Sequence, residues 1–325
     1  MENDDADPLC EIRNYLTRTS CYDAMPESIT TLILDSNLLL TKGAEALITH
    51  SLLGIPVMED GFFKALLGTN DILLLMHYFY HNQSKADSNE MLKSFRVGDV
   101  FKLERPQGLQ YLDMSVHPDV SILTAAKLML EHNQFRAAVL DVEPAANCPK
   151  IKNFRADGSI NLPGHHCILS VITNYRIIRA VARNCNVDKL MVPAKQLMSI
   201  PQYTATMDTP IINVVEMLIG SGVNAIPILD KSGHVINIYS SPDILYFVAD
   251  HDELNLNITI EHALKRRSNN FEGVHTCKEI DNLGHLLRGF QSQSVHRILV
   301  VDDNLKLLGI LRLVDIVRFL VYQDL

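Results

Sequence analysis

The chain has 325 residues, 47 % of them hydrophobic, which is enough length for two or three folded domains and too apolar for a disordered protein. Its formal net charge of −9 argues against the strongly basic surface that broad nucleic-acid binding requires. The first residues are acidic, and no run approaches the ~20 apolar residues of a membrane span, so we expect an intracellular protein without a secretory signal. The six cysteines have no paired spacing and are expected to be reduced thiols.

Four segments of the chain share one pattern, a helix followed by a buried strand that ends at an acidic residue. The first and last residues are 21 positions apart in every segment, at 38–59, 120–141, 209–230 and 281–302. Apolar residues at helical spacing are followed by a short apolar run such as 225–229. A turn signal, a second apolar strand and a new helix come next, as at 235–239 and 241–248. The pattern predicts an α/β (α+β) fold with four strand-helix-strand-strand-helix repeats of about sixty residues each.

The repeats divide the chain into successive parts. In chain order these are an N-terminal segment (1–20), the first repeat (21–83), a linker (84–113), the second repeat (114–183), the third repeat (197–250), a second linker (251–273) and the fourth repeat (274–325). The second repeat carries an insertion between its strands, predicted as a surface loop over 143–164. Its Pro, Gly and Asn content is typical of such a loop, and hairpin connections tolerate added length at low cost.

An aspartate stands in the first turn of the last predicted helix in three repeats. Asp71, Asp243 and Asp315 follow the acidic turn by 12 or 13 positions, and the second repeat has Arg176 instead. A single aspartate there is most simply a helix cap. Three at equivalent positions favour a second role, because a carboxylate can accept hydrogen bonds from both vicinal hydroxyls of a ribose.

Two arginines occupy equivalent positions before a predicted buried strand. Arg136 and Arg297 each precede their acidic turn by five residues, and His296 adjoins the second of them. A guanidinium group suits phosphate oxygens, helix N-termini also suit phosphate, and an apolar pocket between strands suits a purine. The residues therefore predict a nucleotide ligand whose phosphate faces these cations.

Five sequence motifs carry a resemblance to a known family. They are CYDAMP (21–26), ITNYRIIRAV (172–181), NIYSSPDI (237–244), RRSNNFEGVHTC (266–277) and SVHRILVVDD (294–303). The repeat unit resembles the cystathionine-β-synthase (CBS) repeat. The whole chain is similar to the γ subunit of the AMP-activated protein kinase family, and most similar to its fungal members.

The resemblance implies a fold of two tandem CBS pairs arranged as a pseudo-fourfold disc. It also implies a regulatory subunit without catalytic activity, which binds AMP, ADP or ATP and senses energy status and glucose supply. The implied partners are the catalytic (alpha) and scaffold (beta) subunits of a heterotrimeric serine/threonine kinase in the cytoplasm and nucleus. No cofactor, nucleic acid or membrane partner is implied.

Site residues follow from the resemblance position by position. Asp71, Asp243 and Asp315 match ribose-binding aspartates, and Arg136, His296 and Arg297 match phosphate-facing positions. The remaining nucleotide-binding candidates are Thr69, Ser240, Ser241, Ser268 and Arg312.

Departures from the family pattern indicate which repeat supplies the main nucleotide site. The first repeat has Leu53 and Gly68 in place of an arginine and a hydroxyl residue, and the fourth has Arg312 and Val314 in place of two hydroxyl residues. The third repeat keeps its hydroxyls and its carboxylate together. We therefore expect nucleotide to bind chiefly around Asp243, with Arg136 and Arg297 reaching its phosphates, and Arg312 as a substitute phosphate ligand in the fourth repeat.

Several alternatives stay open. Cys148, His165, His166 and Cys167 could be drawn as a zinc site, but their spacing is not that of zinc ligands, and a solvated loop is favoured. The cations at 265–267 either complement the end of a helix or lie near a phosphate or a partner. No glycine-rich phosphate loop, nucleophile elbow or acid/base pair supports an enzyme. A stand-alone CBS adaptor that regulates another enzyme, such as a phosphatase, is the remaining rival.

Overall fold

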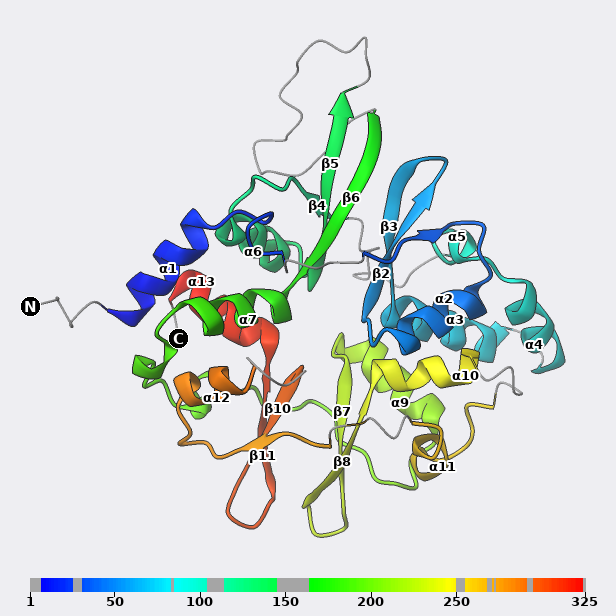
Figure 1. Cartoon of the computed structure of the whole chain (residues 1–325). Helices are drawn as coiled ribbons and strands as arrows, with labels where there is room; N and C mark the ends of the chain where they lie inside the picture. The colour runs from blue at the N-terminus through cyan, green and yellow to red at the C-terminus, as the bar shows by residue number, and fades with distance from the viewer. Residues whose placement is uncertain are drawn as a thin grey trace, which may run out of the picture. The chain divides into compact units, whose positions relative to one another are not determined.

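The chain folds into two compact units, whose elements are labelled in Figure 1. The computed structural model describes residues 7–25, 31–82, 85–103, 114–144, 164–249, 255–267, 271, 273–290 and 295–323. Unit 1 comprises Met1–Thr31, Asp113–Ile200 and His275–Leu325, and unit 2 comprises Leu32–Leu112 and Pro201–Val274. Unit 1 therefore contains the second and fourth repeats, and unit 2 contains the first and third.

Unit 2 shows the predicted order of elements, complete in the first repeat and without a regular first strand in the third. The first repeat consists of β1 (Leu34–Asp35), α2 (Leu40–Thr49), β2 (Gly54–Glu59), β3 (Phe62–Gly68) and α3 (Thr69–Asn82), and is followed by α4 (Lys85–Ser94) and α5 (Val97–Val100). The third consists of α9 (Ile211–Ser221), β7 (Ala225–Leu229), β8 (Val235–Ser240), the 3-10 helix η2 (Ser241–Ile244) and α10 (Leu245–Ala249), and is followed by α11 (Ile260–Leu264).

The sheets of unit 2 are short and built alike. β2 pairs in parallel with β1 and antiparallel with β3. In the third repeat β7 pairs antiparallel with β8, and a single parallel bridge from Ala205 to Ile228 takes the place of a first strand. This bridge explains why the third repeat has one regular strand fewer than the pattern predicts.

Unit 1 repeats the same design. Its N-terminal helix is α1 (Pro8–Arg18); the second repeat consists of β4 (Ser115–Val116), α6 (Ile122–Glu131), β5 (Arg136–Pro144), β6 (Gly164–Thr173) and α7 (Asn174–Asn184). The 3-10 helix η1 (Val187–Lys189) and α8 (Ala194–Leu197) follow, and the fourth repeat consists of β9 (Thr276–Cys277), α12 (Leu283–Gly289), β10 (Arg297–Val301), β11 (Leu307–Arg312) and α13 (Leu313–Tyr322). The predicted mixed α/β fold of four repeats is confirmed.

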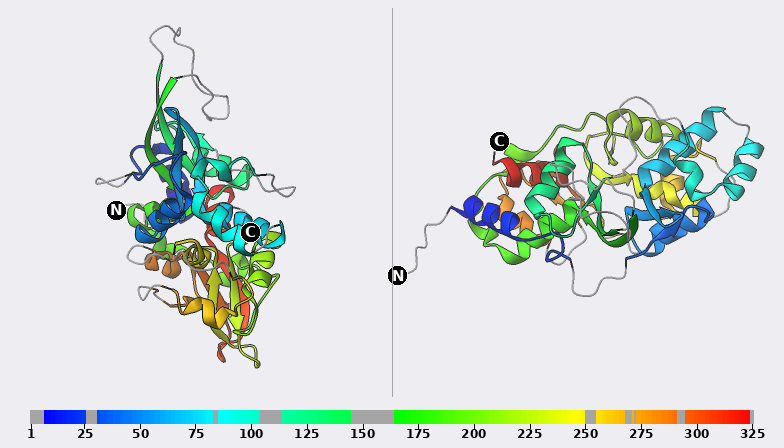
Figure 2. Two further views of the ribbon diagram at one scale, coloured as in Figure 1. Left: turned by 90° about the vertical axis from the view of Figure 1, so that its right-hand side faces the viewer. Right: turned by 90° about the horizontal axis from the view of Figure 1, so that it is seen from above.

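The hairpin of the second repeat is longer than the sequence predicts. β5 and β6 pair from Arg136 opposite Thr173 to Pro144 opposite Gly164, and the hairpin extends beyond the helices of unit 1 (Figures 1 and 2). Both ends of the predicted loop over 143–164 are therefore strand, because the antiparallel ladder continues into the insertion. Residues 145–163 lie outside the described residues.

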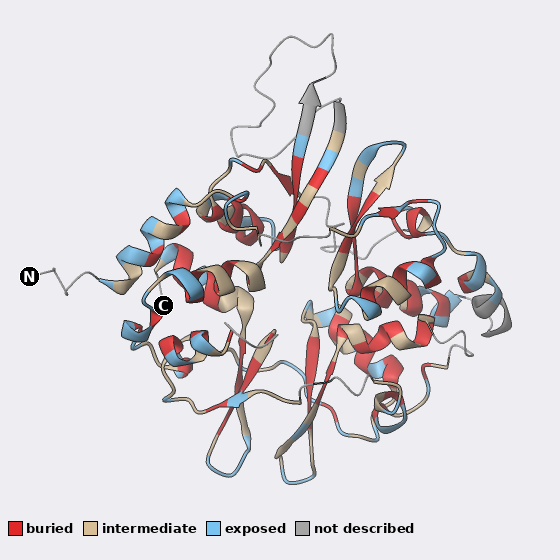
Figure 3. Cartoon of the chain, viewed as in Figure 1, coloured by how far each residue is buried: buried red, intermediate tan, exposed pale blue. Residues whose placement is uncertain are grey.

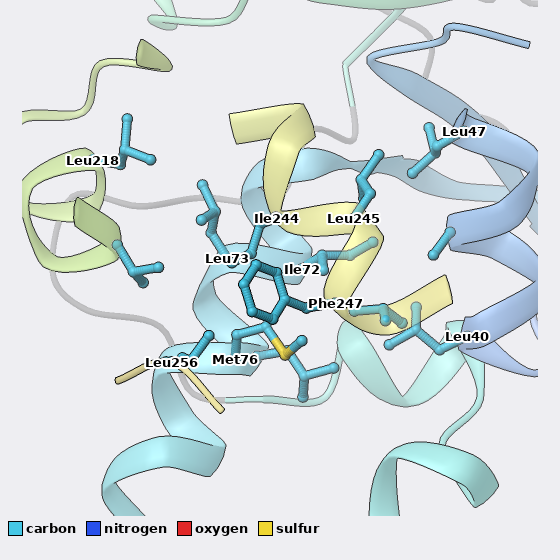
Figure 4. Packing of buried hydrophobic residues seen from close by; sticks show 14 of the residues in the cluster. Leu40, Leu47, Ile72, Leu73, Met76, Leu218, Ile244, Leu245, Phe247 and Leu256 are labelled. Carbon is cyan, nitrogen blue, oxygen red and sulfur yellow. The ribbon is translucent and has the colours of Figure 1, made fainter. Parts of the chain in front are cut away.

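Helices pack in the same way in the two units. In unit 2, α2 packs against α10 and α3 against α9; in unit 1, α6 packs against α13 and α7 against α12. Each contact joins two different repeats, so neither repeat buries its apolar helix faces alone. Figure 4 shows this core in unit 2, where Phe247 of α10 lies among Ile72 and Met76 of α3.

The hairpin tips are among the solvent-facing parts of the fold. Lys231 and Ser232, between β7 and β8, are exposed, as are residues 303–306 between β10 and β11 (Figure 3). Within the described part of the chain, no helix has the length and apolarity needed to span a bilayer. The five described cysteines are all free thiols, as predicted.

Gly284 provides a test of the close approach of α12 to η1 and the residue that follows it, Leu190. A Cβ added there would overlap the carbonyl oxygen of Val187 and lie 3.2 Å from that of Leu190. Backbone atoms cannot move aside cheaply, so we expect Gly284→Ala to lower the free energy of unfolding by about 1–3 kcal/mol. Gly289→Ala on the same helix meets nothing within 4 Å and should leave it unchanged or slightly raised. Equal unfolding midpoints for the two variants in urea would contradict this packing.

Candidate functional site

The three first-turn aspartates share one local geometry. The backbone amide three residues earlier donates to the carboxylate, from Gly68 to Asp71 at 2.6 Å, from Ser240 to Asp243 at 2.7 Å, and from Arg312 to Asp315 at 3.3 Å. Each aspartate therefore acts as a helix cap, which is the simpler of its two predicted roles. The same bond fixes the carboxylate at the end of the preceding strand, where it is positioned to serve a ligand as well.

Asp243 is a buried carboxylate that accepts four hydrogen bonds. Besides the Ser240 amide, it accepts from Ser240 Oγ at 2.9 Å, from Arg267 Nε at 2.7 Å and from Arg267 Nη2 at 2.7 Å. The side chains of Arg267 and Asp243 are only 8 % and 9 % exposed. A carboxylate offers about four lone-pair positions, two on each oxygen. Three of these donors converge on Oδ2, whereas Oδ1 accepts only from Arg267 Nε, so Oδ1 keeps a position for a further donor.

Arg267 is itself held by several contacts. Its guanidinium donates to the carbonyl of Ile238 at 2.7 Å and to Asn237 Oδ1 at 3.1 Å, and it lies 4.1 Å from the ring centroid of Phe271. One role considered for the cations at 265–267 was to complement the C-terminal end of a helix. α11 ends at Leu264, so Arg267 lies beyond that helix. The open question about the cations at 265–267 is therefore answered for Arg267, whose partner is the carboxylate of the third repeat.

A buried pair of hydroxyls joins the first and third repeats. Thr69 and Ser241 each stand two residues before their aspartate, and their Oγ atoms are 2.9 Å apart. Thr69, Ser241 and Asp71 are 2 %, 2 % and 3 % exposed. Equivalent positions of two repeats thus meet in unit 2, and they bring hydroxyl donors beside the capped carboxylates.

Unit 1 contains the predicted cations. Arg136 is the first residue of β5 and Arg297 the first of β10, so both lie at the start of a strand, and Arg136 is only 7 % exposed. His296 adjoins Arg297, and its ring centroid is 5.3 Å from that of Tyr175. The guanidinium of Arg179 lies 6.0 Å from the Tyr175 ring.

The protonation of His296 reflects both its burial and its cationic neighbours. Burial, together with the charges of Arg297 and Arg136, lowers the pKa of His296 to about 4. The ring is therefore neutral at pH 7, and its buried Nδ1 has no hydrogen-bond partner among the described residues. Burial is the larger cause, and the two guanidinium groups add a positive environment that favours an anion.

Two further arginines are engaged within their own repeats. Arg312 donates through Nε to Asp315 Oδ2 at 2.7 Å and through Nη2 to Oδ1 at 2.7 Å, and this hydrogen bonding raises the pKa of Arg312. The guanidinium predicted as a substitute phosphate ligand thus neutralises the carboxylate of its own repeat.

In the second repeat, where the aspartate is missing, Arg176 donates to Ser170 Oγ at 2.5 Å and to the carbonyl of Val171 at 2.7 Å. It lines a small hollow beside Ile122 and Ile177. Burial lowers the pKa of Arg176.

The predicted residues fall into two groups. Unit 2 holds Thr69, Asp71, Ser240, Ser241 and Asp243, and unit 1 holds Arg136, His296, Arg297, Arg312 and Asp315. Ser268, Cys148 and the side chain of His165 lie outside the described residues. The predicted joint action of Asp243 with Arg136 and Arg297 links residues of both units and stays a prediction. Sequence reasoning missed Arg267 as the partner of Asp243, although its motif was among those that carried the family resemblance.

Comparison with known proteins identifies the repeats. The CBS domain family matches residues 194–250 and 272–322, which are the third and fourth repeats. In fold, the chain is similar to the crystal structure of protein MJ1225 from Methanocaldococcus jannaschii, with a TM-score of 0.68, 15 % identity, and coverage of 93 % of this chain and 99 % of that one.

Two yeast proteins are similar over nearly the whole chain. The 5'-AMP-activated protein kinase subunit gamma of Saccharomyces cerevisiae is 31 % identical over 95 % of this chain and 92 % of its own length. The protein of the same name from Kluyveromyces lactis is 30 % identical over 96 % of this chain and 92 % of its own length. The chain therefore belongs to the family of AMP-activated protein kinase gamma subunits.

Proposed function

We propose that the chain is the regulatory, adenine-nucleotide-sensing subunit of a heterotrimeric serine/threonine protein kinase. Membership of the gamma-subunit family makes it a regulator and not an enzyme. The observation that carries the nucleotide assignment is the recurrence of a capped, strand-end aspartate in three repeats, together with the group formed by Arg136, His296 and Arg297. The proposed compartments are the cytoplasm and the nucleus.

The predicted residues are of the two kinds that recognition of a nucleotide needs. Asp243, oriented by Ser240, is the proposed acceptor for ribose hydroxyls. Arg136, Arg297 and His296 are the proposed phosphate ligands, because guanidinium groups bind phosphate through paired charge-assisted hydrogen bonds. The ligands this predicts are AMP, ADP and ATP, which share both parts.

Arg267 makes nucleotide binding at Asp243 competitive. Its two hydrogen bonds take one lone pair on each carboxylate oxygen, and Ser240 donates twice more to Oδ2, so the second of two vicinal ribose hydroxyls gains a place only when one of these donors leaves. A buried carboxylate without donors is costly, and the pair with Arg267 keeps Asp243 compensated when no sugar is bound. On this account Arg267 holds the site in a closed form that nucleotide opens.

Co-purification tests the assignment to a kinase. Tagged full-length chain, expressed in its native cells, is expected to recover one kinase catalytic chain and one scaffold chain in a stable ternary complex. We also expect these partners to raise its melting temperature, because sheets of two or three strands have unpaired edges that a partner can cover. Recovery of a phosphatase, or of no kinase, would favour the adaptor alternative instead.

His296 gives a spectroscopic readout of phosphate binding. In the free chain its imidazole should titrate near pH 4, and its contribution to stability should be complete above about pH 6.5 and lost as the pH falls toward 4. A bound phosphate favours the imidazolium, so saturating AMP should raise the titration midpoint. Histidine-labelled NMR, with the resonance assigned through His296→Asn, measures both values. A midpoint that AMP leaves unmoved would remove His296 from the phosphate site.

A further inference from the structure

Helices α3 and α9 of unit 2 bring two histidines and a glutamate together outside the proposed nucleotide residues. His77 and His81 are four residues apart on α3 and therefore lie on one face of it, with their ring centroids 4.4 Å apart. Glu216 projects from α9, and its Oε1 lies 3.4 Å from His81 Nε2. One ligand atom from each of the three residues lies within 4.8 Å of the others.

One of these separations is that of a tetrahedral metal site. Zinc bonds of 2.0–2.1 Å place neighbouring ligand atoms about 3.3 Å apart, which the His81–Glu216 pair already matches. The side chains of His81 and Glu216 are 44 % and 48 % exposed, so both have room to turn toward an ion.

A surface ion pair is the simpler account of His81 and Glu216, but it gives no role to the second histidine. Two adjacent imidazoles repel when both are protonated, whereas one cation bound between them uses both lone pairs. The repeat fold does not require histidine at these positions. His77 and His81 follow Asp71, the first-turn residue of the first repeat, by 6 and 10 positions. The residues at these two positions in the other repeats are Ala182 and Asn186 in the second, Ala249 and Glu253 in the third, and Val321 and Leu325 in the fourth.

We propose that His77, His81 and Glu216 bind a divalent transition-metal ion of the zinc type, with water as the fourth ligand. Two imidazoles and one carboxylate are a zinc ligand set, and the exposed side leaves the water position open. The ion joins α3 of the first repeat to α9 of the third, and so acts as a clip within unit 2. His77 follows Asp71 by six residues along α3, about 9 Å of helix, so the ion does not share the ribose carboxylate.

Titration of the full-length chain with Zn²⁺ against a chromophoric chelator tests the proposal, and Co²⁺ serves as the spectroscopic probe. We expect one ion per chain, a tetrahedral Co²⁺ absorption spectrum, and a melting temperature that rises with Zn²⁺. Glu216→Gln and His81→Gln should each weaken binding by at least about tenfold, since even outer-shell changes cost that much. His50→Gln, at an exposed position of the same unit, is the matched control and should leave the affinity unchanged.

The outcomes separate this inference from the nucleotide assignment. Absence of saturable Zn²⁺ binding, or binding that neither Glu216→Gln nor His81→Gln weakens, would overturn the metal site and leave an ordinary ion pair. AMP titrations of the same variants report on the other proposal. Both substitutions lie at exposed positions, and circular dichroism checks that the variants are folded.

Discussion

Arg267→Met is expected to lower the free energy of unfolding by about 3–5 kcal/mol, because it leaves the buried Asp243 carboxylate without its charged partner. Methionine retains most of the apolar stem of arginine, so packing changes little. The lost hydrogen bonds include those to the carbonyl of Ile238, which loses this donor, and to Asn237 Oδ1, which keeps the bond from the Ile238 amide. Urea unfolding of the chain, followed by circular dichroism, measures the loss.

The matched control is an exposed ion pair of the same chemistry. Arg288 pairs bidentately with Asp188, with side chains 58 % and 48 % exposed, and Arg288→Met should therefore cost about 0–1 kcal/mol. The double variant Asp243→Asn with Arg267→Met should recover part of the stability that Arg267→Met loses, since no charge is then left buried alone. Equal losses for Arg267→Met and Arg288→Met would show that the Asp243 pair is not a buried, desolvated one.

Arg297→Ala is expected to weaken AMP binding roughly tenfold or more. A nucleoside monophosphate carries about two negative charges at neutral pH, and hydrogen bonds to charged groups contribute about 1.5–3 kcal/mol each. A loss of 1.4 kcal/mol corresponds to a factor of about ten in affinity. Isothermal titration at one fixed salt concentration is needed, because salt screens the phosphate interaction.

Arg318→Ala is the control for the general effect of charge. Arg318 is exposed on α13 of the same unit, so its removal changes the net charge equally and should leave the affinity within about twofold. A similar loss in both variants would mean that only the overall field attracts the ligand. An unaltered affinity in Arg297→Ala would remove Arg297 from the phosphate ligands.

The repeat pattern was sufficient to predict the elements, because local periodicity determines them. The apolar run at 225–229 and the strand at 235–239 correspond to β7 and β8, and the equivalent positions of Arg136 and Arg297 both begin a strand. The hairpin of the second repeat was predicted too short, because the inserted residues carry loop composition while backbone pairing alone extends β5 and β6. Which repeats pair to form a unit was not predicted. This pairing depends on which helix faces of different repeats pack together, and the spacing within one repeat carries no information about its partner.

The sequence predicted which residues form the candidate site, but it did not predict most of the contacts between them. Local spacing identifies the capped aspartates, since the cap links residues three apart. The bond from Arg267 to Asp243 spans 24 positions and depends on how the segment after α11 returns to the third repeat. The Thr69–Ser241 hydrogen bond spans 172 positions and has no local signal at all. Of the metal cluster, the two histidines four apart on one helix are visible in the sequence, but Glu216 is not.

Titration of three aspartate variants with AMP tests the central claim most directly. Asp71→Asn, Asp243→Asn and Asp315→Asn each keep an oxygen for the capping amide and remove the charge that accepts ribose hydroxyls. At one salt concentration, Asp243→Asn is predicted to weaken binding roughly tenfold or more and Asp71→Asn much less. Loss of binding in Asp71→Asn or Asp315→Asn, with binding intact in Asp243→Asn, would contradict the assignment of the main nucleotide site to the third repeat.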